Sequence, residues 1–173
     1  MPWTLIIPSL LLAAGCVTIV VFSRREGYRL LLRNIDASAE EIINLTRRHI
    51  DIYERLYALI FFFDNDSSVE KQKFSLGDSR DMQEVFELNI QIDLEVSILL
   101  EKAMASEKLT SERSVSLNNL NEELGEYEKN LAPALILYNQ QIDEVKKRTR
   151  FSLSKKLLKD LGECTYSSIT FPR

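Results

Sequence analysis

Residues 32–63 read LRNIDASAEEIINLTRRHIDIYERLYALIFFF, and the spacing of apolar residues in this stretch decides the fold class. The seam positions alternate in steps of three and four residues, and eight of the ten are apolar: Leu32, Ile35, Ala39, Ile42, Thr46, His49, Tyr53, Leu56, Ile60 and Phe63. A heptad seam of this kind is typical of an α-helix that packs against other helices. No proline occurs between Ser9 and Gly77. We therefore expect one long helix that ends at residues 61–63, followed by a polar connection over residues 64–80.

Three later segments also show helical spacing. The first begins at Asp81 and carries apolar residues as far as Met104, and the second begins near Ser111. Pro133 lies inside the second segment, where a proline removes one hydrogen bond and should kink the helix. Residues 151–161 form a short amphipathic stretch, and no segment shows the alternation that is typical of a β-strand.

The first 23 residues carry no Asp, Glu, Lys or Arg. Within them, residues 5–22 read LIIPSLLLAAGCVTIVVF and are apolar except for Ser9 and Thr18. As a helix, this stretch would rise about 27 Å, close to the ~30 Å hydrocarbon core of a bilayer. A helix that packs on a soluble core normally shows a polar stripe, which this segment lacks. The sequence therefore predicts a transmembrane helix.

The charges that follow this helix predict its orientation. All basic residues near it lie after it, starting with four arginines among residues 24–33. The positive-inside rule then places the N-terminus outside and the rest of the chain on the cytoplasmic side of the cell membrane. A competing interpretation is a lipoprotein anchored at Cys16, because residues 11–16 read LLAAGC, with small residues before the cysteine. The apolar run continues past Cys16, which favours an uncleaved span. A cleaved signal peptide would need a basic start, which is missing.

Together these segments predict an all-α fold. A transmembrane anchor over residues 1–23 continues into an antiparallel bundle of three to four long helices over residues 24–162, and residues 163–173 form a flexible tail. Amphipathic helices within one short chain bury their seams most simply against each other, in a bundle.

Composition and motifs argue against several functional classes. With 22 Lys and Arg against 26 Asp and Glu, the net charge of −4 does not favour a general nucleic-acid binder. His49 is the only histidine, so a di-iron bundle with Glu-x-x-His on two helices is excluded for a single chain. Gly-rich phosphate loops, Cys-x-x-Cys pairs and nucleophile elbows do not occur. We therefore expect no enzyme, and no catalytic, cofactor-binding or metal-binding residues. His49 is expected to be buried against another helix, with pH sensing as the alternative.

One stretch is strongly basic. Residues 146–159 contain seven basic residues and no acidic one: Lys146, Lys147, Arg148, Arg150, Lys155, Lys156 and Lys159. Leucines are interleaved at helical spacing, which is the pattern of a basic amphipathic helix. In one interpretation the leucines pack on the bundle and the lysines cover the acidic segment at residues 81–101. In the other, the stretch contacts anionic lipids of the inner leaflet.

Two stretches of the chain resemble the LemA family. The first runs from LLLRNI at residues 30–35 to TRRHID at residues 46–51, and the second runs from LNEEL at residues 120–124 to Tyr138-Asn139. A Leu-Arg-Asn element after a hydrophobic segment, a basic pair and a Tyr-Asn pair are typical of that family. Where the family usually has Ile-Pro-Asn-Leu, this chain reads IYERL at residues 52–56, so the chain is similar to a divergent member. The resemblance implies an antiparallel helical bundle on a membrane anchor, and no established reaction.

Two functions remain open on the sequence. The first is a membrane-anchored scaffold or interaction protein that presents long helical faces to another protein. In it, Arg47, Arg48, Tyr138 and Asn139 would form interhelical hydrogen bonds and salt bridges, partly on the strength of the resemblance. The second is a ligand-binding or sensor module whose bundle core holds a small molecule and signals along the long first helix. Homo-oligomerisation also stays open, because exposed heptad seams favour it.

Overall fold

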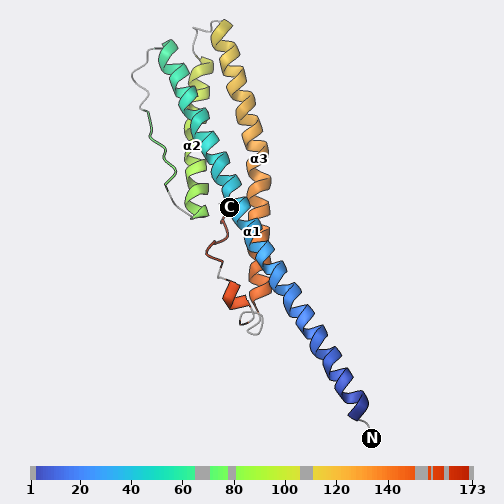
Figure 1. Cartoon of the computed structure of the whole chain (residues 1–173). Coiled ribbons are helices and arrows are strands. Elements are labelled where there is room, and N and C mark those ends of the chain that lie inside the picture. The colour runs from blue at the N-terminus through green and yellow to red at the C-terminus, as the bar shows by residue number, and fades with distance from the viewer. Residues whose placement is uncertain are drawn as a thin grey trace. The chain divides into compact units, whose positions relative to one another are not determined.

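The computed structural model describes residues 3–64, 71–77, 81–105, 111–150, 156, 158–161 and 164–171 (Figure 1). Within these ranges, the side chains of residues 3–8, 63–64, 111–113 and 159 are not described. The described elements are α1 (Trp3–Asp64), α2 (Met82–Ala105), α3 (Ser111–Thr149) and the 3₁₀ helix η1 (Lys159–Leu161). The described part of the chain holds no strand, so the predicted all-α class is confirmed.

The predicted membrane span lies inside α1, so its helical state is confirmed. No helix in the described part of the chain is long and apolar enough to cross a membrane. The side chains at the start of the predicted span, residues 5–8, lie outside the described set. The span itself therefore stays a prediction.

The chain divides into two compact units. Unit 1 combines residues 1–37 with 140–165, and unit 2 combines residues 38–139 with 166–173. This division falls within α1 and within α3. The boundaries that the sequence predicts after residues 23 and 162 stay predictions.

In unit 2, the seams of α1, α2 and α3 form one core. Its central cluster consists of Ile52, Tyr53, Leu56, Ile60, Ile92, Val96, Leu99, Ala103, Leu120, Leu124 and Tyr127. The heptad positions that the sequence assigns to α1 are buried from Ile42 to Ile60. Burial of these large side chains supplies most of the stability of such a core, at roughly 1.5–3 kcal/mol each.

In unit 1, the start of the α1 seam meets the end of α3. Tyr28, Leu31 and Ile35 of α1 are buried, as are Ile142 and Val145 of α3. Tyr138 and Ile142 are four residues apart, where strict three-four alternation along α3 would give three, and this one-residue slip keeps both residues and Val145 buried. At this start of the α1 seam the sequence predicts Leu32 as the first buried position, but the buried residue is Leu31 and Leu32 is only half-buried.

An extended segment at residues 71–77, called the strap below, packs on the helices of unit 2. The backbone N–H of Gln72 donates to the Tyr53 hydroxyl at 3.0 Å, and Phe74 meets the Tyr53 ring edge-on, with 4.9 Å between ring centres. Figure 1 shows the strap as a non-helical trace that returns the chain toward the start of α2. There, Asp81 caps α2 by accepting a hydrogen bond from the backbone N–H of Gln83 at 2.9 Å.

Candidate functional site

The core of unit 2 contains a cluster of polar side chains, which we call the polar cluster. Thr46 and His49 come from α1, Asn89 and Asp93 from α2, and Tyr127 from α3. Thr46, His49, Asn89 and Tyr127 are all buried, and each occupies a seam position of its helix. Polar groups at such positions must find partners inside the protein, because an unpaired buried polar group costs free energy.

Asn89 joins the three helices. Its amide Nδ2 donates to Thr46 Oγ1 at 2.8 Å and to the Val85 carbonyl at 2.9 Å. Thr46 in turn donates its hydroxyl proton to the Ile42 carbonyl at 2.9 Å, so its oxygen is free to accept from Asn89. On the other side, Asn89 Oδ1 accepts from the Tyr127 hydroxyl at 2.7 Å. These contacts fix the amide orientation of Asn89.

The orientation of Asn89 sets the tautomer of His49. His49 Nδ1 lies 3.3 Å from Asn89 Oδ1, an acceptor, so Nδ1 carries the imidazole proton. The remaining nitrogen, Nε2, lies 3.2 Å from Asp93 Oδ1 but makes no hydrogen bond of acceptable geometry. Two lone pairs face each other there when His49 is neutral and Asp93 is ionised. The His49 ring also stacks on Tyr127, with 4.0 Å between ring centres.

Burial shifts the pKa values of this cluster. Desolvation lowers the pKa of His49 to about 4, against a smaller opposing effect of the Asn89 hydrogen bond. Desolvation raises the pKa of Asp93 to about 6, and the negative charge of Glu128 adds to this. Burial also raises the pKa of Tyr127. At neutral pH the buried imidazole is therefore uncharged.

Ion pairs surround the polar cluster on the surface of unit 2. Arg55 of α1 binds both carboxylate oxygens of Glu123 on α3, at 2.8 and 2.9 Å. Of the two arginines singled out in the sequence, Arg48 reaches Glu126 on α3 at 3.2 Å, whereas Arg47 donates to Asn44 on its own helix at 3.0 Å. Exposed pairs of this kind contribute about 0–1 kcal/mol each. Bidentate Arg–carboxylate geometry mainly fixes how α1 and α3 are aligned.

Tyr138 and Asn139, the other two residues singled out in the sequence, hold an extended segment rather than another helix. The Tyr138 hydroxyl donates to the Ser167 carbonyl at 2.9 Å, and the Asn139 side chain forms two hydrogen bonds with the backbone of Ile169. The sequence predicts a flexible tail over residues 163–173. Residues 164–171 are described, and these contacts were not expected from the sequence.

The basic stretch at residues 146–159 is only partly described. Lys146 pairs with Asp143 at 3.7 Å and Arg148 pairs with Glu144 at 2.9 Å, both within α3. Lys147, Arg150 and Lys156 are exposed. Lys155 and the side chain of Lys159 lie outside the described residues.

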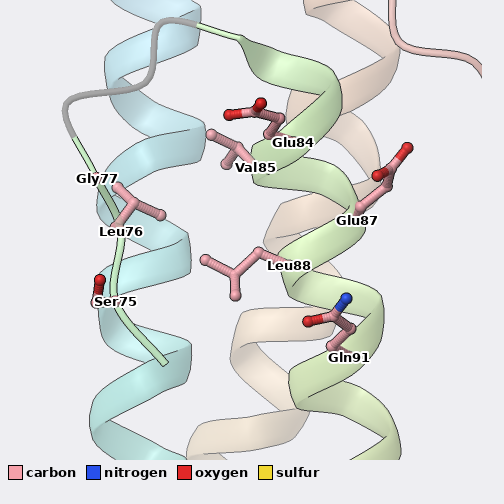
Figure 2. A pocket seen from close by; sticks show the side chains of 8 residues that line it. All are labelled: Ser75, Leu76, Gly77, Glu84, Val85, Glu87, Leu88 and Gln91. Carbon is pink, nitrogen blue, oxygen red and sulfur yellow. The ribbon is translucent and has the colours of Figure 1, made fainter. Parts of the chain in front are cut away.

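A surface pocket of about 260 Å³ lies between the strap and the first turns of α2. Its lining consists of Ser75, Leu76, Gly77, Glu84, Val85, Glu87, Leu88 and Gln91. Figure 2 shows the strap along one side and α2 along the other, with Leu88 pointing toward the strap. The pocket is separate from the central core cluster of unit 2, with which it shares no lining residue other than the peripheral Leu88.

Among the described residues, no group of three or more His, Cys, Asp or Glu side chains is arranged to hold a metal ion. No family model, no curated protein and no solved structure matches this chain.

Proposed function

We propose that this chain is a membrane-anchored, non-enzymatic helical scaffold that presents its helices to a protein partner. The observation that carries the proposal is the apolar surface at the start of α1. Leu12, Ile19 and Phe22 are 70%, 70% and 66% exposed, and Leu10, Leu11, Val17 and Val20 are also exposed. At 100° per residue, these positions surround the helix, so no polar face is left for water.

A lipid bilayer is the environment that best covers a helix with apolar side chains on all sides. Apolar side chains around a whole helix suit lipid tails, and a helix satisfies its own backbone hydrogen bonds there. The arginines that begin at Arg24 would lie at the cytoplasmic headgroups, with the bundle on the cytoplasmic side. The resemblance to the LemA family implies the same layout, and we propose the chain as a divergent relative of that family.

The partner surface that we favour is the outward face of α2. Ile90, Leu94 and Ile98 follow each other at four-residue spacing and are all exposed. We call this row the α2 ridge. Apolar residues aligned on an exposed helix face are typical of protein interaction sites. The alternative function is a sensor with a ligand inside the bundle core, and the pocket between the strap and α2 does not bear on it because this pocket lies on the surface.

Extraction of membranes with alkaline carbonate tests the anchor. We expect the full chain to stay with the membrane pellet and a Leu11→Arg/Val20→Arg variant to move to the supernatant, because two buried charges oppose insertion. The matched control, Leu11→Ile/Val20→Leu, should behave like the wild type. A wild-type chain in the supernatant would contradict the proposal.

The same extraction separates the two kinds of anchor. Cys16 is exposed on α1. If the apolar helix is the anchor, Cys16→Ser stays in the pellet. If a lipid on Cys16 is the anchor, that variant is released, and the lipoprotein interpretation replaces the span.

A further inference from the structure

Residues 166–171 lie on unit 2 as an extended chain, and side chains of α2 and α3 bind their backbone. Asn139 Nδ2 donates to the Ile169 carbonyl at 3.0 Å, and Asn139 Oδ1 accepts from the Ile169 N–H at 2.8 Å. One side-chain amide thus makes the pair of hydrogen bonds that a neighbouring β-strand would make with one residue. This pairing does not depend on which side chain Ile169 carries.

Two more contacts extend this recognition along the segment. The Thr170 N–H donates to Gln83 Oε1 at 2.8 Å, and the Ser167 carbonyl accepts from the Tyr138 hydroxyl at 2.9 Å. Side chains of two helices therefore bind four backbone groups over four residues. Extended peptides are recognised in this way, with backbone hydrogen bonds for affinity and pockets for alternate side chains for specificity.

The side-chain contacts follow the same alternation. Ile169 is 4% exposed, whereas Thr170 next to it is exposed. Two residues after Ile169, Phe171 meets Phe86 of α2 edge-on, with 5.4 Å between ring centres, and stays 45% exposed. These contacts favour an aliphatic residue followed, two positions later, by an aromatic one. We call the surface formed by Gln83, Phe86, Tyr138 and Asn139 the peptide groove.

The segment buries one side chain fully, that of Ile169, and this gain is opposed by the conformational entropy lost when six residues are ordered. Its covalent connection to the rest of the chain keeps its local concentration high, which for linked binding partners reaches the order of millimolar. An incoming peptide must overcome that concentration before it can occupy the groove.

We propose that the peptide groove is a recognition site for extended peptides and that residues 166–171 are its internal ligand. A partner segment with an aliphatic residue followed two positions later by an aromatic residue displaces them. This inference goes beyond the proposed function, since neither the membrane anchor nor the α2 ridge requires it.

Fluorescence anisotropy with a labelled synthetic peptide of residues 165–173, TYSSITFPR, tests the proposal on the full chain in mild detergent. The Ile169→Asp variant should release its own segment, because a carboxylate cannot be buried at this position without a partner. We expect this variant to bind the peptide at least tenfold more tightly than the wild type. A control peptide with proline at the Ile169 position lacks the N–H that Asn139 accepts from, and should not bind.

Two additional variants on the Ile169→Asp background locate the binding site. Asn139→Ala should abolish peptide binding and Gln83→Ala should weaken it several-fold, while circular dichroism shows that both retain their helices. Gln83→Ala keeps the test valid if Asn139→Ala fails to fold. Equal affinity of wild type and Ile169→Asp, binding of the proline peptide, or no binding to folded Ile169→Asp would each overturn the proposal. A wild-type dimer that the peptide converts to monomers would also overturn it, because residues 166–171 would then bind the peptide groove of a second copy of the chain.

Discussion

Asn89 of α2 makes side-chain hydrogen bonds to both neighbouring helices of unit 2. Its amide contacts Thr46 and His49 on α1 and Tyr127 on α3, so it satisfies polar groups of both neighbouring helices. In a seam of apolar residues, one such group also fixes the register, because a shift of any helix by one position would leave these polar groups unpaired. The polar cluster is thus expected to select one arrangement of the three helices.

Replacing Asn89 by leucine tests this role. Leucine has nearly the same size but leaves the Tyr127 hydroxyl and the His49 Nδ1–H without an acceptor. We expect the free energy of unfolding in urea to fall by about 2–3 kcal/mol. Ser97→Ala on the same helix is the control, because Ser97 is exposed and bonds only the carbonyl of Asp93 in its own helix among the described contacts. It should change stability by less than about 0.5 kcal/mol. A stable Asn89→Leu protein would contradict the assigned role.

His49 and Asp93 affect the pH dependence of stability in opposite directions. The folded pKa of His49, about 4, lies below its ordinary value of 6.5, so the unfolded chain binds more protons there and stability falls as the pH drops through this window. The folded pKa of Asp93, about 6, lies above its ordinary value of 3.8, so stability rises as the pH drops through that window. Glu128 on α3 also faces Asp93. The two effects overlap between about pH 4 and 6.

Single substitutions should separate these two effects. In Asp93→Asn only the His49 effect remains, so we expect stability to fall by about 2–3 kcal/mol between pH 6.5 and 4. In His49→Gln only the Asp93 effect remains, so stability should rise as the pH drops from 7 to 4, by a smaller amount because Asp93 is half-exposed. Urea denaturation at several pH values measures both slopes relative to the wild type. If the stability of the two variants changed with pH in the same direction, the opposite pKa shifts of His49 and Asp93 would be contradicted.

At the scale of single elements, the sequence predicts α1 and α3 better than it predicts α2. The α1 seam includes Thr46 and His49, and both are buried where the heptad places them. In α2, a search for apolar residues selects Ile90, but the buried position is Asn89, at heptad spacing between Val85 and Ile92. The heptad spacing predicts which face of a helix is buried. A choice based only on apolar residue type assigns the wrong residue when the buried side chain is polar.

The peptide groove could be predicted only in part. Tyr138 and Asn139 stand out in the sequence, but their partners are backbone groups of residues 166–171, and backbone groups leave no pattern in a sequence. Ile169 is a single aliphatic residue without helical or strand periodicity around it, so nothing marks it as buried. The contacts of His49 could not be predicted either, because its neighbours Asn89 and Tyr127 come from helices 40 and 78 residues further along the chain.

The proposed role of the α2 ridge in binding a protein partner can be tested separately. Leu94 is 63% exposed, so Leu94→Glu should leave the free energy of unfolding nearly unchanged while disrupting an apolar interface. We expect proteins that co-purify with the full chain from mild detergent to be lost with this variant. Asn119→Glu adds the same charge at an exposed position of α3 and should retain them. Loss with both variants, or with neither, would contradict a specific role of the ridge.

For the whole molecule, the net charge of −4 averages two regions of opposite sign. The helix α2 carries five acidic residues and one basic residue, whereas residues 146–159 contain seven basic residues and no acidic one. Within unit 1 the basic end of α3 lies against the first charged turns of α1, since a Cβ on Gly27 would come within 3.2 Å of Arg148 Nη1. If residues 5–22 span the membrane, these turns lie at the headgroups. The basic end of α3 is then placed next to the lipid surface.

Amine labelling of the reconstituted full chain tests this placement. Lys147 is exposed near the end of α3, and each basic residue at an anionic surface gains on the order of 1 kcal/mol. A membrane-impermeant, amine-reactive reagent is placed in the vesicle compartment that contains the helical bundle. We expect it to modify Lys147 several-fold more slowly in anionic vesicles than in neutral ones. High salt should remove the difference, because it screens the attraction. Lys129, exposed on α3 in unit 2, is the internal control and should react equally in both lipids. Equal rates at Lys147 would mean that the basic stretch serves the packing of the protein rather than the membrane.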